Sequence, residues 1–177
     1  MKLVEKNPAQ AEALGRELRQ GSEAPLKRRR GVVGLSLISI ASMGVIALYQ
    51  MGILKHVPEP PSPGLDADKV NGSAQAYTYL STPDAVLGLG SYAATLSLAA
   101  MGPADRAEKT PWVPVALAAK VGLDAILAGK LTVDQWTKHR AFCLWCLLSA
   151  GSTFLALPLV IPEARAALRK LKQRRVG

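Results

Sequence analysis

Two cysteines stand together in the segment RAFCLWCLLSA, at the start of a long apolar run, and the chain has no others. On a helix, the spacing of Cys143 and Cys146 places both sulfur atoms on one face, close enough for a disulfide after a small adjustment. We expect Cys143 in the first helical turn, where the helix N-terminus and the basic residues 138–140 lower its pKa. Cys143 should then be the reactive thiol that is open to water and to partners, with Cys146 shielded one turn deeper.

Two other roles of the cysteine pair are open at this point. Cysteines in a membrane helix can be inert packing residues, and a single Cys-x-x-Cys motif does not exclude that role. A metal site is a weaker alternative, because two thiolates need two further ligands and His56 and His139 are the only histidines. Leu147 follows Cys146, so there is no haem attachment motif either. We therefore predict no metal site, and at this point the residues leave both a redox pair and an inert pair open.

Four apolar runs must position this pair. Residues 31–54, 85–101 and 141–161 carry no charge, and residues 112–131 are interrupted in the middle by Lys120 and Asp124. At a rise of about 1.5 Å per residue, the 24 residues of the first run exceed a hydrocarbon core of about 30 Å, and the 17 residues of the second are the lower limit for a span. The pattern predicts an all-α, integral membrane four-helix bundle with a long outer loop between helices 1 and 2.

The segments between and around these runs are polar or rich in helix breakers. Residues 1–30 form a polar basic tail with a short solvated helix at residues 7–20, and residues 170–177 form a second basic tail. Residues 55–83 begin with four prolines in KHVPEPPSPG and must be an aqueous loop, because unpaired backbone cannot face lipid. We predict one membrane domain over residues 31–169 between two cytoplasmic tails, with residues 132–140 as a second outer segment.

The positive charge of the chain is concentrated at its two ends. The net charge is +9, and residues 1–30 hold eight of the 22 Lys and Arg while residues 165–177 hold six. Basic clusters that flank apolar spans are typical of cytoplasmic membrane flanks, so we expect membrane lipid and no nucleic acid as a partner. Four spans then place both termini in the cytoplasm, and place the cysteines with the 55–83 loop on the oxidising face of a bacterial inner membrane.

Lys120 and Asp124 stand four residues apart in the third run and share one face of a helix. They can form an ion pair that is turned into the bundle or a water-filled groove, or they can be a proton or ligand site within the membrane. The sequence leaves both interpretations open.

The chain resembles bacterial homologues of vitamin K epoxide reductase in three features. Residues 81–96, STPDAVLGLGSYAATL, are similar to the family's segment of small and apolar residues with Gly and Tyr at this spacing, here Gly88 and Tyr92. The segment FCLWC is similar to the family's redox motif, and the order of four spans with a long outer loop after the first also matches. The resemblance covers residues 31–169.

The resemblance implies a four-helix bundle that holds a quinone, of the ubiquinone or menaquinone type, near the outer surface. Cys146 matches the deeper cysteine that reacts with the quinone, and Cys143 matches the one that takes up electrons from elsewhere. Asp84 and Gly88 fall in the implied quinone site, where the family often has an asparagine in place of Asp84. A carboxyl group donates a hydrogen bond to a quinone carbonyl only when it is protonated, so either Asp84 is protonated in the site or this contact is lost.

A further departure from the family concerns the 55–83 loop. The family usually carries a second cysteine pair there, which relays electrons from a thioredoxin-like protein to the helix pair, and this loop has none. The segment DADKVNGSA aligns with that pair, with Asp66 and Gly72 among the residues present instead, and Ser73 matches the serine that commonly follows the second cysteine.

Two functions are compatible with this resemblance. The first is a membrane thiol-disulfide oxidoreductase that passes electrons between the dithiols of a thioredoxin-like periplasmic protein and a membrane quinone, with the partner reaching Cys143 directly. The second is a non-catalytic membrane homologue of the same fold that binds a partner protein or lipid. Replacing both cysteines with serine would preserve the non-catalytic function but would abolish the oxidoreductase function.

Overall fold

The computed structural model describes residues 7–176, and all of its regular secondary structure is helical, so the predicted all-α class is confirmed. Among these residues, pairing of the strand type is confined to an isolated bridge between Leu65 and Phe142. In chain order the helices are α1 (Pro8–Gln20), α2 (Ala24–Gln50), α3 (Ala67–Asn71), the 3₁₀ turn η1 (Ala74–Tyr77), α4 (Asp84–Ala100), α5 (Arg106–Lys109), α6 (Trp112–Asp134), the π-helical turn η2 (Gln135–His139) and α7 (Leu144–Val176).

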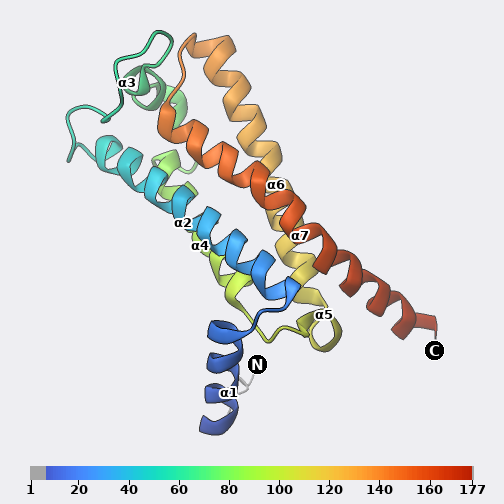
Figure 1. The fold of residues 1–177 in the computed structure, drawn as a ribbon. Helices are drawn as coiled ribbons and strands as arrows, with labels where there is room; N and C mark the ends of the chain where they lie inside the picture. Colours follow the sequence, from blue (N-terminus) through green and yellow to red (C-terminus); the bar gives the residue numbers. More distant parts are fainter. Residues whose placement is uncertain (1–6, 177) are drawn as a thin grey trace.

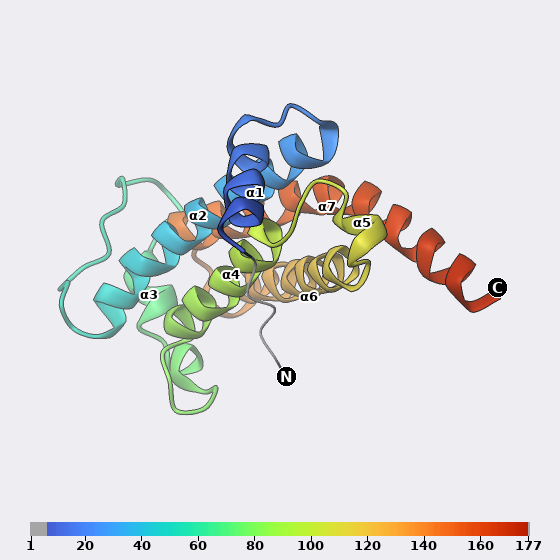
Figure 2. The ribbon, with the colours of Figure 1, turned by 90° about the horizontal axis from the view of Figure 1, so that it is seen from below.

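Four long helices, α2, α4, α6 and α7, run along the length of the molecule (Figure 1). α2 packs against both α4 and α7, and α6 packs against α7, whereas α4 and α6 touch over a much shorter stretch. The connection from α2 to α4, which includes α3, lies at one end of these helices, and α1 and α5 lie at the other end (Figures 1 and 2). The limited contact between α4 and α6 leaves room for a cavity at the α3 end.

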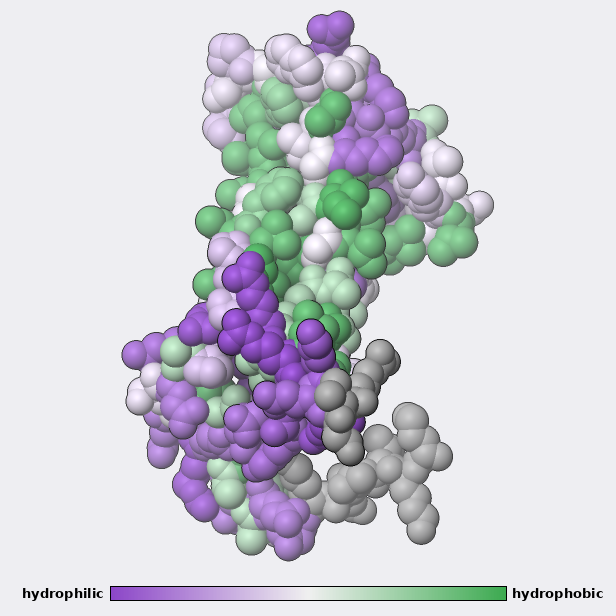
Figure 3. Space-filling model, turned by 90° about the vertical axis from the view of Figure 1, so that its right-hand side faces the viewer, coloured by the Kyte–Doolittle hydropathy of each residue, from purple (hydrophilic) through white to green (hydrophobic). Residues whose placement is uncertain are grey.

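Three helical segments are long and apolar enough to cross a membrane, namely Ala24–Gln50, Trp112–His139 and Leu144–Arg174, and α4 is a shorter apolar helix of 17 residues. Large apolar side chains on these helices are exposed, among them Ile38, Ile126 and Leu155. Figure 3 shows, on the face in view, an apolar band across the middle of the molecule with polar surface toward both ends. A band of this kind is suited to contact with lipid, as expected for a membrane protein.

The first spanning helix is displaced from the apolar run that predicted it. α2 begins at Ala24, ahead of residue 31, because Pro25 in the first turn is compatible with a helix start. It ends at Gln50 rather than at residue 54, because Gly52 adopts a positive φ of 75° that reverses the chain. The predicted solvated helix at residues 7–20 is confirmed as α1, whose first turn is capped by the Asn7 side chain.

The segment 132–140, predicted to lie outside the membrane, is helical for most of its length, and its outer position stays a prediction. The helix continues through Asp134 and then as a π-helical turn to His139. The Lys130 and Lys138 ammonium groups both bind the Asp134 carboxylate, at 2.7 and 3.0 Å. These two i,i+4 pairs extend the helix beyond its apolar run, which the hydropathy pattern alone does not show.

Two buried arginines hold the C-terminal end of α4. The Arg29 guanidinium donates hydrogen bonds to the five backbone carbonyls of residues 99–103. Arg106 is fully buried, binds the Glu163 carboxylate through two hydrogen bonds of 2.7 Å, and donates to three carbonyls within residues 98–101. Carbonyls at a helix C-terminus have no partner within the helix, so the two arginines satisfy them and tie α4 to α2 and α7.

Candidate functional site

The cysteine pair lies at the start of α7, earlier in the helix than expected. α7 begins at Leu144, so Cys143 precedes the first turn instead of belonging to it. The Cys143 carbonyl accepts the hydrogen bond of the Leu147 N–H at 3.0 Å, and the Cys143 sulfur accepts that of the Cys146 N–H at 3.4 Å. Cys143 therefore caps the helix with its sulfur, as Ser or Asp does at many helix starts.

This capping geometry lowers the pKa of the Cys143 thiol from its ordinary value to about 7, mainly through hydrogen bonding with the Cys146 side chain and backbone. The direction agrees with the sequence-based expectation, and the backbone N–H groups at the helix start contribute as expected, whereas the basic residues do not. The basic residues before the pair were expected to lower this pKa, yet Lys138 is bound to Asp134 instead. The lowered pKa favours the thiolate of Cys143, the form that attacks disulfides and leaves them readily.

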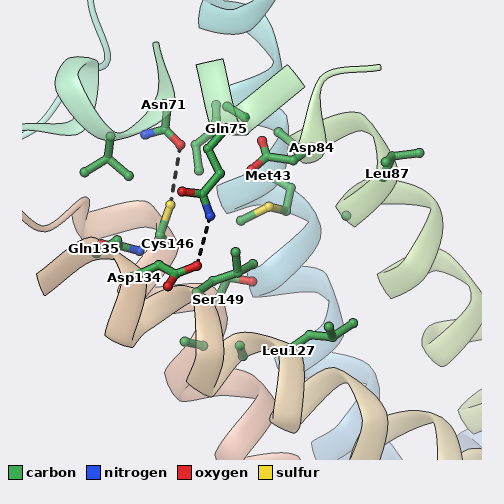
Figure 4. Close-up of a pocket in the computed structure, with 18 of the residues that line it drawn as sticks. Met43, Asn71, Gln75, Asp84, Leu87, Leu127, Asp134, Gln135, Cys146 and Ser149 are labelled. Carbon is green, nitrogen blue, oxygen red and sulfur yellow. Dashed lines mark hydrogen bonds between the residues drawn. The ribbon is translucent and has the colours of Figure 1, made fainter. Parts of the chain in front are cut away.

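The two thiols differ in exposure in the opposite sense to the prediction. Cys143 has no exposed surface, whereas Cys146 is partly exposed to a cavity. The Cys146 thiol donates a hydrogen bond to the side-chain oxygen of Asn71, at 3.5 Å (Figure 4). The expectation that Cys143 is open to water and Cys146 is shielded is therefore wrong, because the connection between α2 and α4 folds over Cys143.

Three sets of contacts hold this connection over Cys143. The backbone of Phe142 pairs with that of Gly64 and Asp66, through hydrogen bonds of 2.8 and 2.9 Å. The Glu59 carboxylate accepts hydrogen bonds from the backbone N–H groups of Ala67 and Leu144, and so joins the loop to the first turn of α7. The indole of Trp145 donates to the Pro58 carbonyl at 2.7 Å. We call residues 56–68 the latch, because they cover the start of α7.

Breaking the latch should expose Cys143. In a Cys146→Ser background, we expect Glu59→Ala to speed the labelling of Cys143 by a membrane-impermeant maleimide about tenfold, because each lost hydrogen bond is worth on the order of 1 kcal/mol and labelling follows local opening. Lys55→Ala, at an exposed position just before the latch, is the matched control and should leave the rate unchanged. Equal rates in the two variants would show that Glu59 does not govern access.

A cavity of about 520 Å³ lies between α4, α6 and the start of α7, under α3 and η1 (Figure 4). Its walls are mostly apolar, with a few polar groups, and its volume is within the usual range of about 300–1,000 Å³ for ligand sites. Leu127 lines the cavity and is also 56% exposed on the outer surface of α6, so the wall is continuous with the lipid-facing surface. The residues that line the cavity include Met43, Asn71, Asp84, Gly88, Gln135 and Cys146.

The structure places both residues of the implied quinone site, Asp84 and Gly88, on this cavity wall. The Asp84 carboxylate accepts a hydrogen bond of 2.7 Å from the Gln50 side chain, whose oxygen in turn accepts the Ala85 N–H. Gly88 lies close to α2, because a Cβ atom there would meet the sulfur of Met43 at 3.0 Å. Asp84 thus has a neutral donor as partner, and Gly88 allows α4 to approach α2 beside the cavity.

Lys120 and Asp124 form the ion pair that their spacing suggested, at 2.5 Å. The pair is turned toward α4, where Lys120 also donates to Ser91 at 2.7 Å and the Asp124 carboxylate accepts from Ser91 and Thr95. Asp124 and Ser91 line the inner part of the cavity. The interpretation as an ion pair facing the bundle is confirmed, and a proton or ligand role stays a prediction.

Three polar residues near the cysteines were not singled out from the sequence. Asn71 is buried in α3 and accepts from the Cys146 thiol, and Gln50 at the end of α2 holds Asp84. Gln135 accepts the backbone N–H of Cys143 at 2.9 Å. No sequence spacing marks isolated amide side chains as part of a site, although Asn71 belongs to the segment that was expected to align with the loop cysteines. In residues 7–176, no cluster of three or more His, Cys, Asp or Glu is arranged to hold a metal ion.

The model of the vitamin K epoxide reductase family matches residues 31–161, which is well over half of the chain and includes α4, the cavity walls and both cysteines. No curated protein matches the chain.

Proposed function

Because the chain belongs to the vitamin K epoxide reductase family, whose members are membrane oxidoreductases, we propose that it passes electrons from the dithiol of a partner protein, through Cys143 and Cys146, to a membrane quinone. The observation that carries this proposal is the position of the two sulfur atoms. Cys146 opens on an apolar cavity, while Cys143 lies under the latch at the end of the helices. One thiol therefore faces a site for a lipid-soluble acceptor and the other faces the side from which a protein can approach.

The proposed cycle has two half-reactions. In the first, a partner thiolate attacks the Cys143 sulfur of the oxidised pair, the disulfide bond breaks, and Cys146 leaves and takes up a proton. The second partner thiol then attacks the mixed disulfide, so the partner becomes a disulfide and Cys143 is released. In the second half-reaction the two thiols become a disulfide again, and the two electrons and two protons pass to the quinone, which becomes a quinol.

The cavity is compatible with a quinone of the ubiquinone or menaquinone type. A quinone ring is flat and apolar with an oxygen at each side, which suits apolar walls that carry a few polar groups. A long isoprenoid tail could leave past Leu87 and Leu127, which line the cavity and are partly exposed on the outer surface. The lipid would then accept the tail while the ring stays near Cys146.

The proposed setting is a bacterial inner membrane with both termini in the cytoplasm. In this arrangement α2, α4, α6 and α7 form a four-span bundle over residues 31–169, and the latch faces the periplasm, where a thioredoxin-like partner would act. The basic residues at both ends of the chain support this orientation. Reporter fusions at Gly64 and at the C-terminus should report opposite sides of the membrane, and the same side for both would contradict the four-span arrangement.

The direct test is quinone reduction by the purified protein in lipid nanodiscs, with dithiothreitol as the dithiol and a ubiquinone or menaquinone analogue as the acceptor. We expect the unsubstituted protein to form quinol well above background, and the Cys143→Ser/Cys146→Ser variant to remain at background. The preferred analogue would identify the quinone class. If the two proteins were equal, the chain would be a non-catalytic binding protein of the same fold, an alternative supported by the absence of loop cysteines.

A further inference from the structure

Gln135 joins the cysteine pair to the wall of the cavity. It is the first residue of the π-helical turn η2, its side chain is 5% exposed, and it lines the cavity next to Cys146 (Figure 4). Its side-chain oxygen accepts the backbone N–H of Cys143 at 2.9 Å. Single π-helical turns are uncommon overall, but they often occur at functional sites. The π-helical turn of this protein begins with Gln135.

The hydrogen bond from Cys143 decides which way the Gln135 amide is turned. Since the oxygen faces the Cys143 N–H, the Nε2 group, with its two donors, faces the other way. No acceptor for Nε2 is found in residues 7–176, and no buried side-chain nitrogen or oxygen of these residues lacks a partner. Nε2 is therefore not sealed inside the protein, and the surface available to it is the cavity.

Three polar side chains that line the cavity near Cys146, those of Asn71, Asp84 and Ser149, offer it acceptors, and the Ser149 hydroxyl already donates its proton to Tyr92 at 2.8 Å. Asn71 turns its oxygen toward the Cys146 thiol, because its nitrogen donates to the Ala67 carbonyl at 2.8 Å. Asp84 offers a carboxylate. Both carbonyl oxygens of a quinone only accept hydrogen bonds, so neither Asn71 in this orientation nor an ionised Asp84 can bind one. The Gln135 amide, next to Cys146, supplies a donor that these three side chains do not.

We infer that Gln135 donates a hydrogen bond from Nε2 to a carbonyl oxygen of the quinone and thereby holds the ring beside Cys146. This inference rests on the proposed function and names the group that binds its acceptor. The same side chain keeps the Cys143 backbone in place through its oxygen, so one amide fixes the thiol pair and the substrate relative to each other. Hydrogen bonds to the carbonyl also favour the extra electron density that the oxygen gains on reduction.

The test measures binding without turnover. In the Cys143→Ser/Cys146→Ser protein, the dissociation constant of a ubiquinone analogue is measured by quenching of tryptophan fluorescence. Adding Gln135→Glu keeps an oxygen for the backbone N–H of residue 143 and replaces the donor by a carboxylate, and we expect binding to weaken about tenfold, the effect of one good hydrogen bond. Gln173→Glu makes the same change at an exposed position of α7 and should leave the dissociation constant unchanged.

A spectroscopic measurement keeps the test valid if Gln135→Glu fails to fold. With a quinone labelled with ¹³C at one carbonyl, the infrared stretch of the carbonyl bound by Gln135 should lie at lower frequency than that of the free quinone, and should return toward the free value in Gln135→Glu. An unshifted band in the unsubstituted protein, or equal dissociation constants with and without Gln135→Glu, would overturn the inference while quinone reduction by the native protein persists. No quinone binding at all, together with no quinone reduction, would overturn the proposed function as well.

Discussion

Replacing Cys146 with serine is expected to abolish quinone reduction and to trap a mixed disulfide between Cys143 and its periplasmic partner. In this variant the Cys143 thiolate attacks the disulfide form of the partner and displaces one partner thiolate, and Cys146 is no longer there to attack the mixed disulfide at Cys143 and release the partner. The backbone N–H of residue 146, which the variant keeps, lowers the pKa of Cys143 and favours the thiolate that makes this attack. We would purify Cys146→Ser from native membranes under alkylating conditions and look for a larger band that disappears when reductant is added.

The matched control for this trap is Cys143→Ser. It should trap much less partner, because the remaining Cys146 faces the cavity and Asn71 rather than the latch. Since Cys143 is buried beneath the latch, adding Glu59→Ala to Cys146→Ser should increase the amount of trapped partner. A host that contains the partner and quinone but yields no such band would favour the non-catalytic alternative.

The helices of this protein could be predicted from the sequence because lipid requires long apolar runs. Each of the four apolar runs forms a helix over most of its length. The i,i+4 spacing of Lys120 and Asp124 correctly indicated an ion pair. The helix ends were less predictable, because local chemistry decides them. A positive φ at Gly52 ends α2, and a carboxylate shared by two lysines extends α6.

The exposure of the two thiols could not be read from the helix pattern. A helix that enters the membrane buries its second cysteine more deeply than its first, which led to the wrong assignment. Exposure is instead set by contacts between residues far apart in the chain, such as Glu59 with Leu144 and Leu65 with Phe142. The roles of Gln50 and Gln135 have the same origin, since an amide becomes part of a site only when distant elements fold around it.

The second large effect is expected at the opposite end of the helices. Arg106→Met should lower the free energy of unfolding by about 3–5 kcal/mol, because it leaves the buried Glu163 carboxylate without its partner. It also removes three hydrogen bonds to carbonyls near the end of α4. Unfolding would be followed by circular dichroism against the mole fraction of sodium dodecyl sulfate in mixed micelles. Arg165→Met, an exposed position two residues after Glu163, is the control and should change stability by less than about 0.5 kcal/mol.

The double variant Arg106→Met/Glu163→Met separates the two contributions of Arg106. Removing both partners eliminates the unpaired charge, so the double variant should be more stable than Arg106→Met alone, and the part that is not recovered should reflect the lost caps on α4. Because α4 carries Asp84 and Gly88 at its other end, a loosened α4 should also change the cavity. We therefore expect weaker quinone binding in Arg106→Met than in the double variant. A double variant no more stable than Arg106→Met would show that the arginine acts through the carbonyls of α4 rather than through Glu163.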